Sequence, residues 1–154
     1  MPLVLLIPAY RPGPALPRLV ERMAGGPFAA VIVVDDGSTD GTLDYLRSLG
    51  NWLCVRQQAN RGPGAARNAG MREARGEYLA FLDSDDRWAE DKLALQLAAF
   101  AAHPEIGICF TRARFVDAAG QPTGVLSGAP RGRDGRRRRY GCRPDPAGRN
   151  RAGI

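Results

Sequence analysis

The segment Ala30-Val31-Ile32-Val33-Val34-Asp35-Asp36-Gly37-Ser38 decides the fold class of this chain. Its first five residues are apolar at every position, which is typical of a strand that is covered on both faces in a parallel sheet. Two carboxylates and a glycine then end the strand abruptly. Because ligands bind outside the carboxyl ends of strands in open parallel sheets, we expect this polar turn to face a binding site. A solvated turn that caps the next helix is the alternative.

Segments of strand and helix character alternate on both sides of this strand. Apolar runs predict four more strands, at residues 3–7, 52–55, 78–82 and 106–110. Apolar residues at helical spacing predict helices near residues 16–23, 40–49, 64–75 and 93–100. This alternation predicts an α/β protein with a mostly parallel sheet and flanking helices.

The basic charge of the chain belongs to its C-terminal part. Residues 1–120 contain 13 Lys and Arg against 14 Asp and Glu, whereas residues 121–154 contain 9 against 2. From Gln121 the periodicity stops and Pro, Gly and Arg dominate, so we predict one domain over residues 1–120 and a disordered tail over residues 121–154. The tail has no interleaved aromatic residues beyond Tyr140, and we expect no specific nucleic-acid partner.

Cysteine usage and the N-terminal segment indicate the compartment. Cys54, Cys109 and Cys142 have neither paired nor metal-binding spacing, and we expect free thiols. The apolar segment Met1 to Pro8 is too short for a membrane span of about 20 residues and lacks the features of a signal peptide. We expect a cytoplasmic protein, and peripheral association with a membrane stays open.

A second acidic turn, Asp83-Ser84-Asp85-Asp86, directly follows the strand predicted at residues 78–82. In an extended segment, Asp83 and Asp85 project to the same side. Carboxylates are hard ligands that suit Mg²⁺ or Mn²⁺, and Mg²⁺ commonly binds through one or two of them together with substrate phosphates. An Asp-x-Asp pattern alone is weak evidence, but its place after an apolar strand predicts a site for a metal ion and a diphosphate.

The segment Asn60 to Asn68 combines glycines, a helix start and two arginines. Its backbone N–H groups and the helix N-terminus could bind phosphate oxygens. It has neither the Walker pattern nor the dinucleotide-binding pattern of glycines. An ordinary loop with surface arginines is therefore the alternative.

Together these segments resemble the family 2 glycosyltransferases, whose nucleotide-binding domain has the Rossmann-like GT-A fold of nucleotide-diphospho-sugar transferases. The resemblance covers residues 2 to about 118 and depends on four motifs in the right order and spacing. They are Ile7-Pro8-Ala9-Tyr10, Val33 to Thr42, Asn60-Arg61-Gly62 with Ala66 to Gly70, and Gly76 to Asp86.

The resemblance implies a donor site for a nucleoside diphosphate sugar, with UDP- or dTDP-sugars as the expected class. Seven residues would line it: Pro8, Ala9, Tyr10, Asp36, Arg67, Asp83 and Ser84. Asp36 would hydrogen-bond the base, and Asp85 would ligate the Mg²⁺ or Mn²⁺ ion. Family enzymes transfer the sugar with inversion at the anomeric carbon, so the resemblance implies a metal-dependent glycosyltransferase of cell-wall or polysaccharide biosynthesis.

No catalytic residue is assigned, because the family's general base lies in an acceptor-binding half, downstream of every matched motif. After about Gly120 no segment resembles that half, and Asp134 and Asp145 lie in the Arg-rich tail. We hypothesise a truncated product with an incomplete fold, its tail read in a shifted frame, which binds the donor without transferring the sugar. The acceptor, whether saccharide, lipid or protein, is not defined.

Two other classes of protein share single features with this sequence. Nucleotidyltransferases usually place a Gly-rich loop with Lys or Arg after the first strand, whereas Pro8 to Pro12 occupies that turn here. A nucleic-acid binder would use the arginines of the tail, yet no known binding module precedes them. Both are less favoured than a sugar transferase.

Overall fold

The structure is a computed structural model, and it describes residues 2–117 and 119–127. The chain divides into two compact units, one up to Trp88 and one from Ala89 onward. The predicted domain division at residue 120 stays a prediction.

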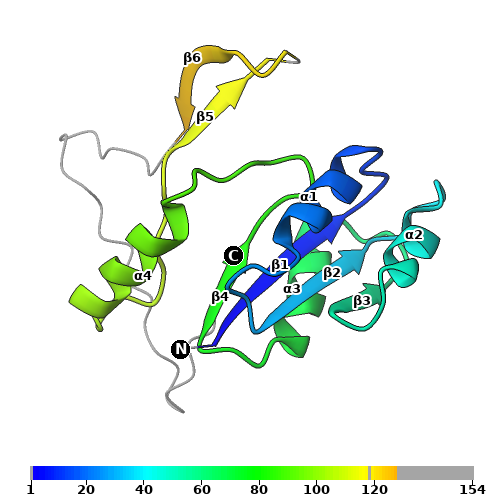
Figure 1. The fold of residues 1–154 in the computed structure, drawn as a ribbon, viewed down its shortest axis with the longest axis horizontal. Helices are drawn as coiled ribbons and strands as arrows, with labels where there is room; N and C mark the ends of the chain where they lie inside the picture. The colour runs from blue at the N-terminus through cyan, green and yellow to red at the C-terminus, as the bar shows by residue number, and fades with distance from the viewer. Residues whose placement is uncertain (1, 118, 128–154) are drawn as a thin grey trace. The chain divides into compact units, whose positions relative to one another are not determined.

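The first unit is built around a parallel sheet of four strands (Figure 1). The strands are β1 (Leu3–Ala9), β2 (Ala30–Asp35), β3 (Leu53–Gln57) and β4 (Tyr78–Phe81), in the order β3-β2-β1-β4. All three neighbouring pairs are parallel, so the carboxyl ends of the strands lie at one edge. The strand order changes direction at β1, and ligand crevices of open α/β sheets form at such a point.

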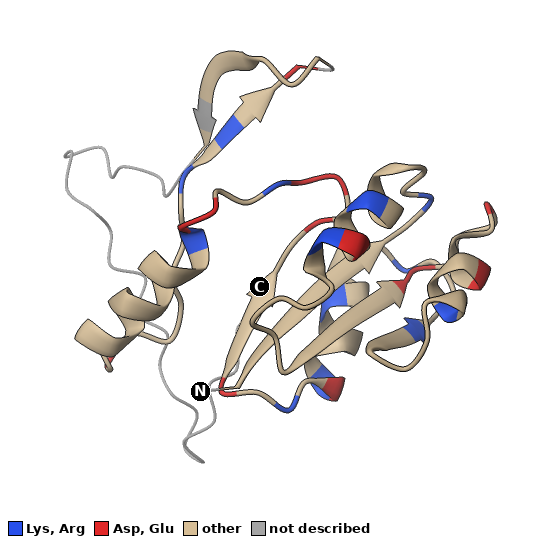
Figure 2. Ribbon diagram, viewed as in Figure 1, with Lys and Arg blue, Asp and Glu red and all other residues tan. Residues whose placement is uncertain are grey.

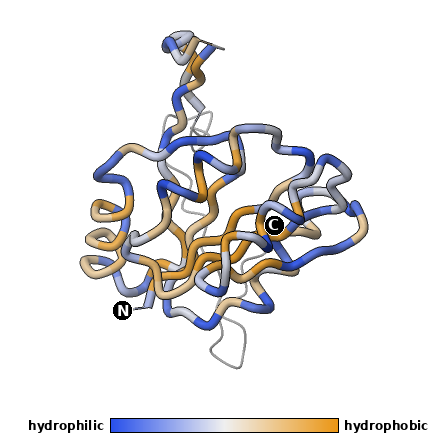
Figure 3. Tube along the Cα trace, turned by 45° about the vertical axis from the view of Figure 1, so that its right-hand side comes forward, coloured by the Kyte–Doolittle hydropathy of each residue, from blue (hydrophilic) through white to orange (hydrophobic). Residues whose placement is uncertain are grey.

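Helices cover both faces of this sheet. On one face, Leu5 and Ile7 of β1 form a buried cluster with α1 (Ala15–Met23) and α2 (Thr42–Ser48). On the other face, Val4 and Leu6 pack with Ala66 of α3 (Pro63–Glu73). Figure 3 shows the strands as a hydrophobic centre between more polar loops. Because β1 is buried at every position, it needs apolar residues throughout, and the predicted α/β class is confirmed.

Helix α3 approaches β1 more closely than a side chain would allow. A Cβ atom at Gly70 would overlap the side chain of Leu6, which is itself fully buried. Gly70 is therefore required for the packing of α3 on the sheet, a role that the sequence did not reveal.

The described part of the second unit, residues 89–117 and 119–127, contains one helix and a hairpin. They are α4 (Lys92–Ala102), β5 (Ala113–Val116) and β6 (Pro122–Ser127), the two strands being antiparallel. The strand predicted at residues 106–110 is wrong, because that run is not paired and the Gln96 amide binds the Cys109 carbonyl at 2.8 Å. The turn at Asp117 aligns β5 with β6 instead, since its Oδ1 accepts from the Gln121 N–H at 2.8 Å.

The tail prediction is wrong at its start. Disorder was predicted from Gln121, but residues 122–127 form β6, because pairing with β5 satisfies their backbone groups. The remainder, residues 128–154, lies outside the described residues, and so do Cys142 and the two acidic residues of the tail. Cys54 and Cys109 are free thiols.

Candidate functional site

The predicted site residues follow neighbouring strands at the carboxyl edge of the sheet. Ala9 pairs with Asp35 across β1 and β2, and the Asp36 N–H donates to the Ala9 carbonyl at 2.8 Å. On the other side of β1, the Leu82 N–H donates to the Leu6 carbonyl at 3.1 Å, so the acidic turn begins beside β1. Figure 2 shows acidic segments after β2 and β4 at this edge. Phe81, the last residue of β4, is level with Leu6 of β1 and Ile32 of β2, so β4 ends three residues before Asp35. With strands spaced by about 4.8 Å and a rise of about 3.3 Å per residue, the ends of β2 and β4 lie about 14 Å apart.

Asp36 holds the start of helix α3. Its carboxylate is buried and accepts from the Gln58 amide at 2.7 Å, the Arg61 N–H at 3.0 Å and the Gly62 N–H at 2.8 Å. Gly62 is the N-cap of α3, where negative charge is favourable. Three donors fill three of the roughly four acceptor positions of a carboxylate, which leaves one position for a further donor.

Asp35 is a buried polar group to which sequence analysis assigned no role, in contrast to Asp36. Its Oδ1 accepts from the Ser38 N–H at 3.2 Å, whereas its Oδ2 is buried without a partner among the described residues. Strand alternation places the two aspartates on opposite faces, with Asp36 toward α3. The alternation of side chains along the strand was the feature of the sequence that could have shown the different surroundings of the two aspartates. A buried carboxylate oxygen of this kind is a position where a water or a ligand hydroxyl binds.

The turn after β1 is held against the turn after β2. The Arg11 N–H donates to Ser38 Oγ and its guanidinium to Thr39 Oγ1, both at 2.9 Å. The guanidinium also lies 5.5 Å from the centre of the Tyr10 ring, whose side chain is exposed. Arg11 has a φ of 45°, so a non-glycine residue is held in the left-handed region next to an exposed aromatic ring. Such local strain is typical of functional turns.

Gly37 allows the turn after β2 to pass close to the segment before α3. Its φ is 83°, and a Cβ at this position would lie 2.8 Å from the Asn60 backbone nitrogen. Both features exclude a side chain. Gly37 is therefore required where the turn after β2 passes the segment before α3.

We expect Gly37→Ala to destabilise the chain by about 2 to 4 kcal/mol, because it adds a backbone collision to the cost of left-handed backbone. Gly41→Ala is the matched control, since Gly41 has a φ of 80° and open space around its Cβ position. Only the backbone cost of about 1 to 2 kcal/mol applies there. Urea unfolding followed by circular dichroism compares the two variants, and equal losses would contradict the close approach.

The acidic turn after β4 is paired with helix α3. Arg67 Nη2 lies 2.5 Å from Asp83 Oδ1, and both side chains are partly exposed. The Asp86 N–H donates to the Asp83 carbonyl at 3.0 Å and closes the turn. The pKa of Asp86 is raised because its carboxyl loses hydration and lies near the charges of Asp83 and Asp85. The turn therefore concentrates negative charge.

The carboxylates of this turn would suit a metal site only if other groups, such as phosphate oxygens, supplied further ligands. In the part of the chain that the structure describes, no three His, Cys, Asp or Glu side chains are grouped closely enough to hold a metal ion by themselves. Mg²⁺ and Mn²⁺ do not need such a cage, since one or two carboxylates with phosphate oxygens and water suffice. The residues present fit a cation that is shared with a diphosphate.

An open parallel sheet with polar turns where the strand order reverses defines a nucleotide-binding type of α/β unit. The chain matches glycosyl transferase family 2 over residues 4–152 and belongs to this family. The resemblance found in the four motifs is thereby confirmed, whereas its predicted limit near residue 118 is wrong, because the match continues to residue 152.

Two curated proteins are similar in sequence to this chain. TuaG of Bacillus subtilis, named for teichuronic acid biosynthesis, is 38% identical over 108 residues, covering 68% of this chain and 42% of its own. WfaP of Escherichia coli, named as a UDP-Glc:alpha-D-GlcNAc-diphosphoundecaprenol beta-1,3-glucosyltransferase, is 38% identical over 69 residues, covering 44% of this chain and 28% of its own. The chain thus spans less than half the length of these relatives.

A solved structure supports the GT-A prediction. The crystal structure of residues 1–349 of S. aureus TarS in complex with UDP-GlcNAc matches with a TM-score of 0.56 and 31% identity. The match covers 68% of this chain and 32% of TarS 1–349. None of the helices described here is both long and apolar enough to cross a membrane.

Proposed function

We propose that this chain provides the donor site of an inverting, metal-dependent glycosyltransferase and binds a UDP-sugar at the carboxyl edge of its sheet. One observation supports this proposal most strongly. The acidic turn, which is paired with Arg67, follows the strand on one side of β1, and the buried carboxylates at the end of β2 lie on the other side. A nucleoside at β2 and a diphosphate at β4 would span this edge. The UDP-GlcNAc complex of TarS supports the choice of nucleotide.

Each side of the edge would bind one part of the donor. The open acceptor position of Asp36 suits an imide N–H of the base, and the exposed ring of Tyr10 offers a surface on which the base can stack. Asp35 Oδ2 suits a ribose hydroxyl. Pro8 and Ala9 form the buried floor at the end of β1.

The acidic turn would bind the diphosphate end. Asp85, an exposed carboxylate, would ligate the Mg²⁺ or Mn²⁺ ion, with Asp83 and Ser84 beside it. When bound, the ion would neutralise the charge that develops on the leaving nucleoside diphosphate. The residues of this chain would orient the diphosphate. Proton removal from the acceptor hydroxyl requires a base that the described residues do not identify.

The relatives favour a cell-envelope polysaccharide as the product. TuaG is named for teichuronic acid synthesis, and WfaP for adding glucose to a lipid-linked sugar. By likeness to them, we propose a saccharide acceptor that is carried on a lipid, with contact to the membrane surface through that acceptor. A donor-binding chain without transfer activity is the alternative.

Titration of the chain with UDP by isothermal calorimetry, with Mn²⁺ and with EDTA, tests the proposed function. We expect binding that is at least about tenfold tighter with Mn²⁺, since the acidic turn would hold an ion that offsets the charge of the diphosphate. CDP and dTDP titrations measure the preference for the base. Equal affinities with Mn²⁺ and EDTA would contradict the metal dependence, and no heat with any nucleotide would contradict the donor site.

A further inference from the structure

Helix α3 connects the two polar turns of the site. At its start, the N–H groups of Arg61 and Gly62 bind the carboxylate of Asp36, which follows β2. Further along, Arg67 pairs with Asp83, which follows β4. One helix therefore contacts both strand ends that flank β1.

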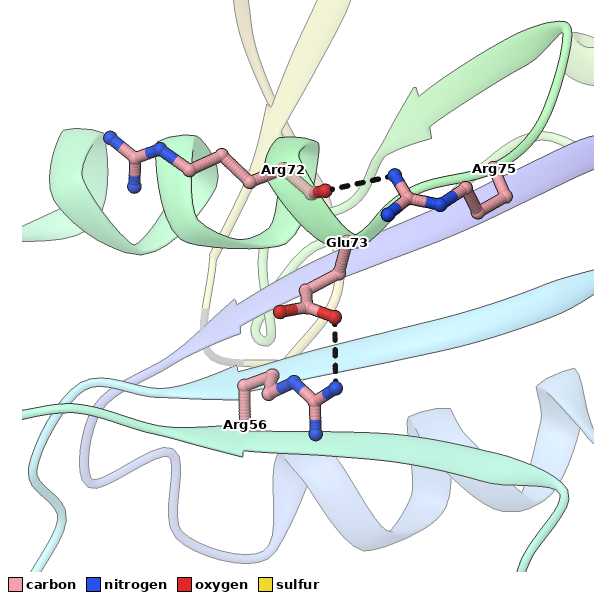
Figure 4. A network of polar contacts seen from close by, with 4 residues as sticks. All are labelled: Arg56, Arg72, Glu73 and Arg75. Atoms are coloured by element: carbon pink, nitrogen blue, oxygen red, sulfur yellow. Dashed lines mark hydrogen bonds and ion pairs between the residues drawn. The ribbon is translucent and has the colours of Figure 1, made fainter.

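The position of α3 is fixed along its whole length. Ala66 is fully buried against the sheet, and Gly70 lies against Leu6 with no space for a side chain. Near its end, Glu73 accepts from the Arg56 guanidinium of β3 at 2.8 Å (Figure 4). Because neighbouring positions on both sides of Arg67 cannot shift, the reach of its guanidinium toward the acidic turn is set by the packing of the helix.

The acidic turn needs such a partner. Asp83, Asp85 and Asp86 place three carboxylates within four residues, and like charges at this spacing repel each other. Arg67 engages one oxygen of Asp83 and thereby fixes the first residue of the turn. The Asp86 N–H bond to the Asp83 carbonyl transmits that position to the end of the turn.

We propose that Arg67 is a positioning residue, which holds the acidic turn in the geometry that accepts the cation and the diphosphate and acts through Asp83 without touching the donor. This inference depends on the proposed function for its ligands. In this proposal, α3 is a rigid support that links the nucleoside side of the donor site to its diphosphate side. Asp36 binds one end of this helix. A direct contact of Arg67 with the diphosphate is the competing role that the tests below separate.

The first test needs no ligand and uses hydrogen exchange of the whole chain. The amides of Leu82 and Asp86 are hydrogen-bonded within or beside the turn. Arg67→Ala is expected to speed exchange of these amides by about fivefold or more, because the turn loses its anchor. Arg67→Lys keeps the charge and should restore part of the protection. Unchanged exchange in Arg67→Ala would overturn the inference, whatever the nucleotide data show.

The second test compares nucleotide affinity with and without metal. Arg67→Ala is expected to weaken UDP binding in Mn²⁺ by about tenfold, whereas UDP affinity in EDTA should stay within about twofold. Arg72→Ala is the matched control, because it removes a guanidinium from the same helix while the Arg75 bond to the Arg72 backbone carbonyl remains possible (Figure 4). It should alter neither affinity.

A double-mutant cycle identifies the partner through which Arg67 acts. In an Asp83→Asn background, Arg67→Ala should weaken UDP binding in Mn²⁺ by no more than about twofold, since the pair is already broken. Full additivity, or an equal loss of affinity in EDTA, would assign Arg67 to the diphosphate and overturn the positioning role. If the unsubstituted chain binds no UDP while the exchange effect is present, the proposed function fails and the support of the turn by Arg67 stands.

Discussion

Replacing Asp85 by alanine is expected to remove the Mn²⁺-dependent part of UDP binding, a loss of at least about tenfold in affinity, because Asp85 is the residue proposed to hold the ion that offsets the charge of the diphosphate. Asp85 is the exposed carboxylate at the middle of the acidic turn, and its side chain has no hydrogen bond or ion pair with any of the described residues. Its removal therefore leaves the Arg67 pair with Asp83 in place. Affinity in EDTA should stay nearly unchanged.

Glu77→Ala is the control for this experiment. Glu77 directly precedes β4, so it lies at the opposite end of the same strand, and its described bond uses the backbone N–H to Pro2. The substitution removes one negative charge from the chain at a distance from the acidic turn. If Mn²⁺ increases the UDP affinity of Asp85→Ala as much as that of Glu77→Ala, Asp85 does not ligate the metal ion.

The second large effect concerns stability. Gly70→Ala should raise intrinsic helix propensity by about 0.5 to 1 kcal/mol, yet we expect it to destabilise the chain by about 1 to 3 kcal/mol. The added Cβ overlaps the buried side chain of Leu6, so α3 must move off β1 or the leucine must leave its rotamer. The sign of the change in the free energy of unfolding, measured in urea, is therefore diagnostic.

A second substitution shows whether the overlap is the cause. Leu6→Val removes the δ-methyl groups that the new Cβ would meet, at its own cost of about 1 kcal/mol. In that background, Gly70→Ala should cost clearly less than in the original chain. Equal costs in both backgrounds would contradict the close packing of α3 on β1.

Sequence analysis placed the strands of the sheet and the polar turns after β2 and β4 correctly. Buried parallel strands are continuous apolar runs, and their ends are marked by a sudden change to Asp and Gly, so both are local features of the sequence. The strand order was not accessible in the same way. It is the order β3-β2-β1-β4 that places Asp36 and the acidic turn on either side of β1.

The contacts within the site could not be predicted, because they depend on how helices pack. Asp36 was predicted to hydrogen-bond a base, and its bonds to the start of α3 follow from the closeness of α3 to β2. The pair of Arg67 with Asp83 joins residues 16 positions apart and requires the packing of Gly70. The hairpin β5–β6 was missed for a similar reason, since the turn at Asp117 decides which residues pair.

The alternation of side chains at the end of β2 has a consequence for how such a protein can diversify. Asp35 faces the side on which the turns of Arg11 and Ser38 meet, while Asp36 faces the helix that leads to the acidic turn. Substitutions in the two turns on the first side would change the surface around Asp35 and leave the bonds of Asp36 to the start of α3 intact. The turns and the helix can therefore vary separately in evolution, although a single peptide bond joins the two carboxylates that face them.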